Sequence, residues 1–207
     1  MNQDTHGAAA LAAGLELDGL ASLVRSFTVR IGTRSGTSMG SGVIWQSDGM
    51  IVTNAHVVRD ERPLVSLDES GSLEARIVAL DRRRDLALLS LDADGLRAAP
   101  IGDVESLRAG SLVLALGHPH GVANAMSLGV VHLVTTRRGM PRYIAADLRL
   151  APGNSGGPLV DTTGRVVGIN AMIVGGLGVA IPSTVVRRFL HEVSRSGAAA
   201  FASPLAA

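Results

Sequence analysis

The sequence Gly-Asn-Ser-Gly-Gly-Pro at residues 153–158 sets a single serine between glycines on both sides. A serine hydroxyl becomes a useful nucleophile when a base takes its proton and donors stabilise the negative charge on the attacked carbonyl oxygen. Gly153 can turn its backbone N–H outward without a Cβ penalty, and Ser155 supplies a second N–H beside its own hydroxyl. The stretch therefore predicts a nucleophile at Ser155 next to an oxyanion hole.

Composition narrows the class of protein that carries this stretch. The chain has 207 residues, of which 46% are hydrophobic and 18% are charged, and its formal net charge is +1. These values predict a soluble globular protein that buries a sizeable core, and they favour no nucleic-acid and no membrane partner. The lack of cysteine excludes disulfides and thiolate metal sites.

Two apolar segments, a possible membrane span and a possible secretory signal, affect the prediction of the cellular compartment. Residues 166–186 carry no charge over 21 residues, which is long enough for a membrane span, but glycines and a proline interrupt them. That pattern favours buried strands joined by a glycine turn. The apolar patch at residues 8–15 is preceded by Asp4 and by no basic residue, which makes it a poor secretory signal. We therefore expect a cytoplasmic protein without a signal peptide or a transmembrane segment.

Short runs of β character, separated by turn residues, fall into two groups. The predicted strands cover residues 27–31, 42–46, 50–53, 64–67, 73–80 and 86–91, and then 112–116, 126–134, 142–146, 159–160, 166–170 and 177–181. A link rich in Gly, Pro and Asp at residues 96–110 separates the groups. The predicted fold is all-β, with two six-stranded antiparallel β-barrels side by side.

A helix is expected at each end of the β-structure. Near the N-terminus, apolar residues recur at helical spacing, namely Leu15, Leu17, Leu20, Leu23 and Val24. Ser183 is expected to cap a second helix over residues 184–194. The predicted divisions are an N-terminal segment at 1–26, a first barrel at 27–105, a second barrel at 106–182, and a C-terminal helix and tail at 183–207.

His56 is the candidate base. It follows the predicted strand 50–53 within Thr-Asn-Ala-His-Val-Val at residues 53–58, where an imidazole can project from one barrel toward the other. A histidine taken alone is more often a solvated or satisfied side chain than a catalytic one. The assignment therefore depends on finding its partners.

Asp85 is the candidate acid, because it opens the apolar run Leu-Ala-Leu-Leu at residues 86–89. A carboxylate at the start of a buried run costs free energy unless it is hydrogen-bonded, and orienting a ring N–H of His56 would satisfy it. The alternative is an acid that closes the turn made by three arginines at residues 82–84. Asp81 is the rival acid and fits that solvated role better.

The order of the three residues along the chain strengthens the assignment. His56, Asp85 and Ser155 follow one of the few orders known for the Ser-His-Asp constellation. It is the order of two-barrel enzymes, in which the first barrel carries the base and the acid and the second carries the nucleophile. The separately predicted strand count agrees with this arrangement.

Several motifs resemble the protease domain of HtrA/Deg-type serine endopeptidases. They are residues 40–42 (GSG), 53–58 (TNAHVV), 85–89 (DLALL), 117–121 (GHPHG), 152–160 (PGNSGGPLV), 168–170 (GIN) and 179–183 (VAIPS). The resemblance covers residues 27–190, nearly the whole chain. It implies a chymotrypsin-like double barrel that needs no cofactor and cleaves peptide bonds in unfolded or misfolded protein.

The resemblance also implies a role for individual residues. His56 is the general base, Asp85 orients it and Ser155 is the nucleophile, with the oxyanion hole formed at Gly153 and Ser155 and Asn154 between them. The pocket for the residue before the scissile bond (P1) is implied at Leu150, Met172 and Ile173, and favours small or medium aliphatic side chains. Substrate is expected to add as an antiparallel strand beside residues 171–173, that is, Ala171, Met172 and Ile173.

Some positions depart from the pattern of the family. Arg149 stands where the charge preference of trypsin-like enzymes is set, and we expect it to pair with Asp147 rather than to enter the pocket. Asn154 replaces the acid that in digestive relatives pairs with a newly cleaved N-terminus. No PDZ-like region is recognised after the last helix. A short loop at residues 175–176 and few aromatic residues near the N-terminus leave both a monomer and a homo-oligomer such as a trimer open.

Three alternatives carry less support. The stretch 153–157 also satisfies G-x-S-x-G of α/β-hydrolase esterases, but that fold needs a helix after the serine, where Pro158 stands. A catalytically silent double barrel that serves as a binding or scaffold protein is the second. Metal binding by His118 and His120 is the third, and no further ligand stands at suitable spacing, so no metal site is predicted.

Overall fold

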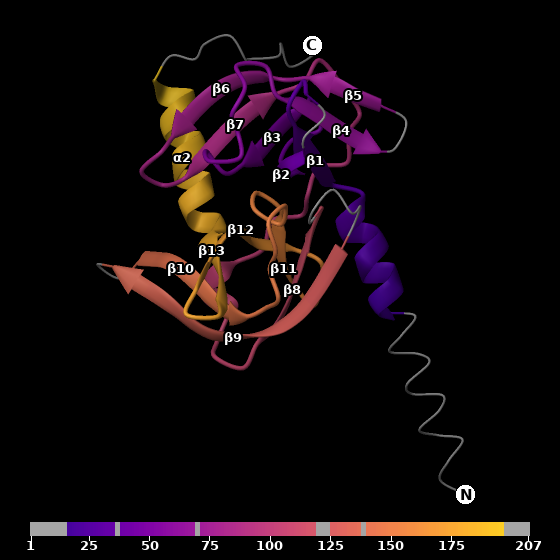
Figure 1. The fold of residues 1–207 in the computed structure, drawn as a ribbon. Coiled ribbons are helices and arrows are strands. Elements are labelled where there is room, and N and C mark those ends of the chain that lie inside the picture. The colour runs from indigo at the N-terminus through magenta and orange to yellow at the C-terminus, as the bar shows by residue number, and fades with distance from the viewer. Residues whose placement is uncertain (1–15, 36–37, 69–70, 119–124, 138–139, 197–207) are drawn as a thin grey trace, which may run out of the picture.

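Two layers of antiparallel β-structure lie one above the other, and each contributes loops to the seam between them (Figure 1). The computed structural model describes residues 16–35, 38–68, 71–118, 125–137 and 140–196. The strands of the first layer are β1 (Thr28–Gly32), β2 (Ser38–Ile44), β3 (Met50–Thr53), β4 (Leu64–Asp68), β5 (Gly71–Glu74), β6 (Arg76–Asp81) and β7 (Leu86–Ser90). Those of the second are β8 (Leu112–Gly117), β9 (Ala125–Arg137), β10 (Met140–Asp147), β11 (Pro158–Asp161), β12 (Val166–Val174) and β13 (Leu177–Pro182).

The second layer is a closed barrel in the order β10-β13-β12-β11-β8-β9, and the first is a seven-stranded sheet in the order β5-β4-β1-β2-β3-β7-β6. The predicted strand at residues 73–80 is in fact two strands. The chain bends at buried Ala75, whose N–H donates to the Pro63 carbonyl at 2.9 Å, and β5 and β6 then pair at opposite edges of the sheet. An alternating pattern does not show where a strand changes partner, so this bend was not predicted. The all-β double-barrel fold is confirmed.

The larger hydrophobic core fills the space between the two layers. Its fully buried members include Phe27, Ile31, Ile51, Leu86 and Leu89 of the first half and Leu114, Leu116, Ile169 and Ile181 of the second. Strand β8 serves both cores, because Leu114 and Leu116 belong to the shared core while Val113 and Ala115 belong to the cluster inside the barrel. Burying apolar surface along the whole seam holds the two halves together.

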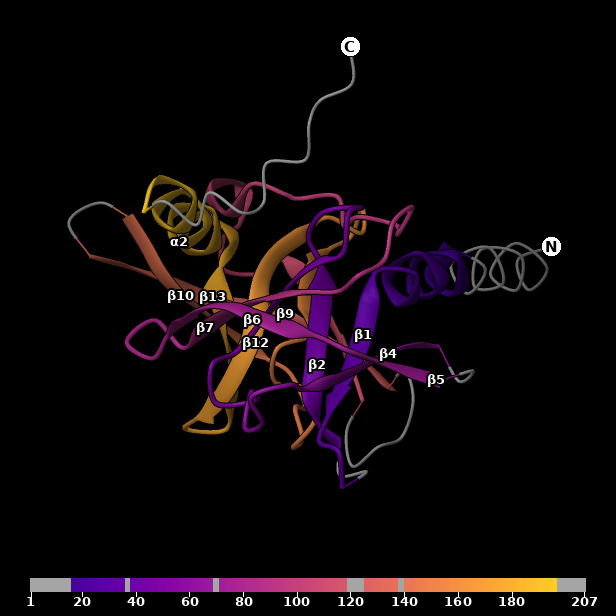
Figure 2. The same ribbon diagram turned by 90° about the horizontal axis from the view of Figure 1, so that it is seen from above.

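Two helices flank the layers on opposite sides, as the view from above shows (Figure 2). The N-terminal helix, residues 16–25, buries Val24 and packs Leu20 and Leu23 against the shared core, as its spacing predicts; Leu15 lies outside the described residues. A short 3-10 helix, η1 (Val104–Ser106), lies in the link between the sheet and the barrel.

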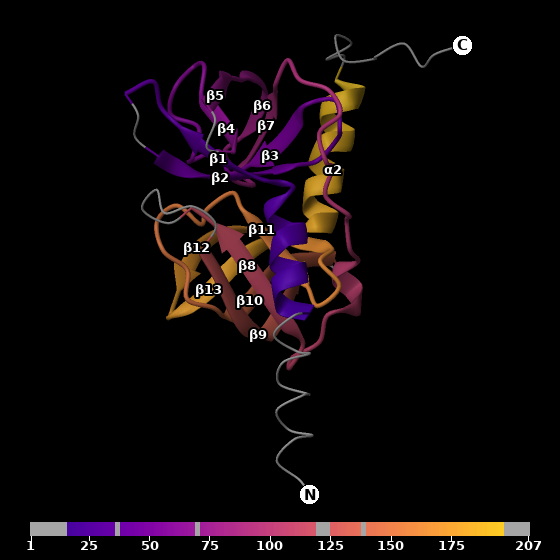
Figure 3. The same cartoon turned by 90° about the vertical axis from the view of Figure 1, so that its right-hand side faces the viewer.

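The C-terminal helix α2 (Ser183–Arg195) leaves the barrel directly after β13 and runs alongside both layers (Figure 3). The predicted cap at Ser183 is wrong. Pro182 is the N-cap and makes no side-chain cap hydrogen bond, whereas the Ser183 hydroxyl donates to the Gly102 carbonyl at 3.1 Å. Because Ser183 is buried, its hydroxyl serves the packing of the helix on the link.

The long uncharged segment forms β12, β13 and the beginning of α2, which confirms the prediction of buried β-structure. Within the described ranges, no helix has both the length and the apolar character needed to cross a bilayer.

Candidate active site

His56 and Asp85 meet at the edge of the first sheet. His56 follows β3 in a short turn, and Asp85 is the residue immediately before β7, which pairs with β3. The His56 Nδ1 atom lies 2.8 Å from Asp85 Oδ2, and the His56 backbone N–H donates to Asp85 Oδ1 at 3.0 Å. One carboxylate therefore holds both the ring and the backbone of the histidine. A proton on Nδ1 leaves Nε2 as the nitrogen that can accept a proton.

The backbone of Asp85 has an uncommon conformation. Its φ of 55° lies in the left-handed region, where Asp is tolerated better than most residues. Asn54 is fully buried and its side-chain N–H donates to the Asp85 carbonyl at 2.9 Å, which ties the turn before β7 to the turn after β3. Sequence reasoning gave Asn54 no role. The sequence does contain a signal for Asn54: it is a polar residue close to the candidate base, in a stretch that is otherwise mostly apolar.

Ser155 is brought to this edge from the barrel. The Ser155 carbonyl accepts the N–H of Ser41 in β2 at 2.8 Å, and the Ser41 carbonyl accepts the Thr53 hydroxyl at 2.7 Å. Ser41 therefore links the serine loop to the end of β3. The Ser155 hydroxyl donates to the Ala171 carbonyl at 3.1 Å. Among the described residues, no hydrogen bond joins it to His56. The structure thus pairs the base with the acid and sets the serine loop beside them, with the hydroxyl turned toward β12.

Two backbone N–H groups of the serine loop point to no acceptor in the described residues, and they belong to Gly153 and Ser155. The N–H groups between and after them are occupied, since Asn154 donates to Ala151 at 3.0 Å and Gly156 donates to Asn170 at 2.8 Å. Gly153 has a φ of 108°, which a residue with a Cβ adopts only with strain. Asn154 contributes no free N–H, and its buried side-chain oxygen has no hydrogen-bond partner among the residues that the structure describes.

A buried polar group supports the serine loop from behind. The Ser41 hydroxyl donates to the Gly153 carbonyl at 2.8 Å and accepts the His118 N–H at 3.0 Å. Its oxygen also lies 3.2 Å from His118 Nδ1. A hydroxyl has one proton, and Ser41 donates it to the Gly153 carbonyl. The contact with His118 Nδ1 therefore needs a proton on that nitrogen, which the imidazole donates to Ser41. These contacts turn the Gly153 carbonyl away from the site.

His118 is held neutral by its surroundings. Its exposed fraction is 7%, and burial together with the positive charge of Arg30 lowers its pKa to about 4. The protonated form would place a charge behind the serine loop. The contribution of His118 to stability is therefore present in full above its ordinary pKa of about 6.5 and is lost as the pH falls toward 4.

We expect His118→Asn to flatten this pH dependence. Asparagine keeps an N–H donor near Ser41 but has no titrating ring, so the wild type should lose up to about 3 kcal/mol more of its unfolding free energy than the variant between pH 7 and pH 4. Urea unfolding at both pH values measures the difference. His132→Asn, at an exposed position of β9, is the matched control. Equal losses in the wild type and His118→Asn would contradict the assignment.

Three of the residues expected to bind substrate, Ala171, Met172 and Ile173, lie in β12. Strand β12 pairs with β11 only as far as Ile169, so beyond it residues 171–174 have β13 on one side alone within the described chain. Met172 and Ile173 are exposed to 42% and 54%. Leu150 lies over Gly178 of β13, where an added Cβ would come within 2.9 Å of its Cδ1 atom.

Arg149 differs from its prediction. Its side chain is exposed, its backbone N–H donates to the Ser127 hydroxyl at 3.1 Å, and no ion pair with Asp147 is formed in the described part of the chain. Because water solvates the exposed guanidinium, Arg149 has no desolvation cost that an ion pair with Asp147 would need to offset. Arg149 therefore places no buried positive charge beside Leu150.

No group of three or more His, Cys, Asp or Glu side chains within the described ranges could hold a metal ion. His120 lies outside those ranges, so the paired site with His118 is not tested. The α/β-hydrolase alternative is excluded by the fold, because the serine is followed by strand β11 rather than by a helix.

Comparison with known proteins relates this site to serine proteases. A family model described as a trypsin-like peptidase domain matches residues 40–169. A probable periplasmic serine endoprotease, DegP-like, from Halomonas elongata is 38% identical over 172 residues, which cover 77% of this chain and 36% of the relative. Serine protease HTR4 of Rattus norvegicus is 39% identical over 178 residues, covering 79% of this chain and 36% of the relative. The chain thus spans about a third of the length of these curated relatives.

A solved structure, an HtrA-type protease AlgW with a decapeptide, matches with a TM-score of 0.77 and 26% identity, covering 86% of this chain and 67% of that one. The expectation of a cytoplasmic protein is contradicted, because the bacterial relatives are named periplasmic endoproteases. That expectation came from the poor secretory signal at residues 8–15 and from the lack of a recognisable transmembrane segment. Neither feature of a folded domain records the compartment in which it works.

Proposed function

Because the chain belongs to the family of trypsin-like peptidase domains, we propose that it is a serine endopeptidase of the HtrA type with His56, Asp85 and Ser155 as its triad. The observation that carries the proposal is the double hydrogen bond from His56 to Asp85, at 2.8 and 3.0 Å, beside a serine loop with two free N–H groups. Such a constellation suits acyl transfer.

In the proposed reaction, His56 Nε2 takes the proton of the Ser155 hydroxyl while Oγ attacks the carbonyl carbon of the substrate. The N–H groups of Gly153 and Ser155 stabilise the oxyanion, and Asp85 stabilises the imidazolium. The imidazolium then gives its proton to the leaving amine as the amide bond breaks, which leaves an acyl-enzyme. Water attacks the ester with His56 again as base, and the imidazolium then gives that proton to Oγ as the ester bond breaks, which releases the carboxylic acid and restores Ser155.

The proposed substrates are extended segments of unfolded or misfolded proteins. A free edge at residues 171–174 offers main-chain groups to a strand, and a folded substrate rarely presents such a strand. The proposed P1 pocket is formed by Leu150, Met172 and Ile173, which are all apolar and favour a small or medium aliphatic P1 side chain. No cofactor is needed for this chemistry, and the oligomeric state of the chain stays open between monomer and trimer.

We expect Arg149→Ala to change the aliphatic P1 preference by no more than about twofold from the wild type. The reason is that water screens an exposed guanidinium, so its charge has little electrostatic effect on a P1 side chain. Fluorogenic peptides that differ only at P1, with Val, Leu, Phe or Glu, measure the preference for the wild type and the variant. Arg142→Ala, at another exposed arginine of the barrel, is the control. A selective loss of cleavage after Glu would show instead that Arg149 lines the pocket.

One observation favours a second candidate, a catalytically silent binding protein. The Ser155 hydroxyl donates to Ala171 and not to His56, so in this conformation the nucleophile has no base. Rotation about the Cα–Cβ bond of Ser155 must precede attack if the chain is an enzyme.

A fluorophosphonate probe and a casein assay separate the two functions. An activated serine displaces fluoride and gains the probe mass at one residue, and we expect that residue to be Ser155, together with hydrolysis of denatured casein faster than of the native form. Peptide mapping identifies the labelled position. An unlabelled chain that binds denatured casein without cleaving it would support the binding protein.

A further inference from the structure

Helix α2 connects the half that carries Ser155 with the turn that carries Asp85. It begins where β13 of the barrel ends and extends along the first sheet (Figures 1 and 3). Val186 and Phe189 are buried in the shared core, so the position of the helix is set by both layers. Its last turns reach the hairpin between β6 and β7.

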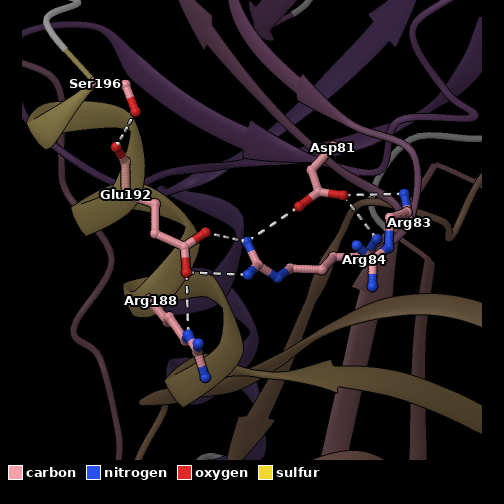
Figure 4. Close-up of polar contacts among 6 residues, drawn as sticks. All are labelled: Asp81, Arg83, Arg84, Arg188, Glu192 and Ser196. Atoms are coloured by element: carbon pink, nitrogen blue, oxygen red, sulfur yellow. Dashed lines mark hydrogen bonds and ion pairs between the residues drawn. The ribbon is translucent and has the colours of Figure 1, made fainter.

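The contact between the helix and that hairpin is a charged cluster (Figure 4). Glu192 of α2 receives two hydrogen bonds from the Arg84 guanidinium, at 2.6 Å from Nη1 to Oε2 and at 3.0 Å from Nη2 to Oε1. Arg84 Nη1 also donates to Asp81 Oδ2 at 3.1 Å, and Arg188 Nε donates to Glu192 Oε1 at 3.0 Å. The paired geometry fixes the direction of Arg84 as well as its distance from the helix.

Both partners of the central pair are stabilised in their charged forms. The hydrogen bonds that Arg84 donates to Glu192 raise the pKa of Arg84, and the hydrogen bonds that Glu192 accepts from Arg84 and then from Arg188 lower the pKa of Glu192. Since Arg84 is 29% exposed and Glu192 is 44% exposed, water screens the pair, and its free energy is modest. The main effect of the pair is therefore geometric, because it fixes the position of Arg84 relative to helix α2.

The hairpin has little freedom between these contacts and the candidate acid. Asp81 Oδ1 accepts the N–H groups of Arg83 and Arg84 at 3.0 Å each, which closes the turn. Asp85 is the next residue, and its left-handed φ aims its carboxylate at His56. One peptide bond thus separates the residue anchored to α2 from the residue that holds the base. Movement of Arg84 would move the carboxylate.

We propose that Arg84 and Glu192 are positioning residues that hold the Asp85 turn against helix α2 and so keep the carboxylate aligned with His56. The pair spans the seam, because α2 continues from the barrel that carries Ser155. This inference rests on the proposed function only for its effect on rate, since the alignment of His56 with Asp85 exists whether or not a substrate is cleaved.

The test compares Arg84→Gln and Glu192→Gln, which remove one charge each, with Arg188→Gln as the matched control. Arg188 contacts the same carboxylate but not the hairpin. Arg84→Lys keeps the charge without the paired geometry and serves as the conservative variant. Thermal unfolding first shows that each variant is folded.

Two measurements follow. We expect Arg84→Gln and Glu192→Gln to lower kcat on a fluorogenic peptide by about tenfold with KM within about twofold, because misalignment affects the chemical step. Arg188→Gln should stay within about twofold, and Arg84→Lys should fall between. The downfield proton NMR signal of the His56 Nδ1 hydrogen, identified by its loss in Asp85→Asn, should broaden in the first two variants and persist in Arg188→Gln.

An unchanged kcat and an unchanged downfield signal in folded Arg84→Gln and Glu192→Gln would overturn the inference while leaving the protease assignment intact. A wild-type protein that cleaves nothing would instead remove the proposed function, and the NMR signal would still decide the positioning role. If Arg84→Gln does not fold, Glu192→Gln and Arg84→Lys give the same comparison.

Discussion

Ser155→Ala should abolish hydrolysis of denatured casein, with a loss of about 10⁶-fold in kcat, because the substitution removes the hydroxyl proposed as the nucleophile. The fold should be retained. Within the described part of the chain the Ser155 hydroxyl makes a single hydrogen bond, to Ala171, while the backbone bond from Ser41 does not depend on the side chain. Binding of unfolded substrate should also remain, since the edge at residues 171–174 is untouched.

The measurement is the initial rate with fluorescein-labelled denatured casein, together with retention of the same casein on immobilised protein. Ser47→Ala, in the exposed hairpin before β3, is the matched control and should match the wild type. Equal turnover by Ser155→Ala and the wild type would end the protease assignment. Loss of both turnover and casein retention would show that the substitution damages the binding edge as well.

Asp85→Asn should lower kcat by about 10⁴-fold with the fold intact. Asp85 accepts two hydrogen bonds from one histidine, on Oδ1 from the backbone N–H and on Oδ2 from Nδ1. Asparagine has one oxygen and one NH₂ group, so it can accept only one of them. If the asparagine NH₂ faces His56 Nδ1, the ring proton moves to Nε2 and His56 can no longer act as the base. If the NH₂ faces the His56 backbone N–H, two hydrogen-bond donors face each other without an acceptor.

The backbone should tolerate this change, because asparagine adopts the left-handed conformation of residue 85 as readily as aspartate. Rates at several pH values and the near-ultraviolet circular dichroism of both proteins test the expectation. Asp48→Asn, in the exposed hairpin before β3, is the control. Turnover equal to the wild type would move the acid to another residue, and Asp81 would be examined first.

The three candidate catalytic residues could be proposed from the sequence because each stands at a marked boundary. His56 follows a short apolar strand whose bounds, residues 50–53, agree with β3, and Asp85 opens the buried run of β7. Strand alternation and turn residues act over a few positions, so they can be read locally. Asp81 was assigned to the arginine turn on the same basis, and it accepts N–H groups of that turn.

Other features could not be read locally because they join distant residues. Arg84 and Glu192 are 108 positions apart, and Ser41 and Gly153 are 112 apart. The residues next to each of these partners in the sequence do not indicate that the two will meet. The direction of an exposed side chain such as Arg149 likewise depends on what surrounds it after folding. The bend at Ala75 is of the same kind, since it depends on which neighbour each half of the strand finds.

The amino-acid sequence by itself determined the β-rich fold, and it predicted the two-part division of the chain and the residues proposed as base, acid and nucleophile, because periodicity, turns and residue chemistry are short-range properties. Only the tertiary structure decided that the Ser155 hydroxyl rests on Ala171, that Ser41 and His118 support Gly153, and that α2 anchors the Asp85 turn. Those contacts arise when two layers and a helix pack around one core, and packing is a property of the whole chain.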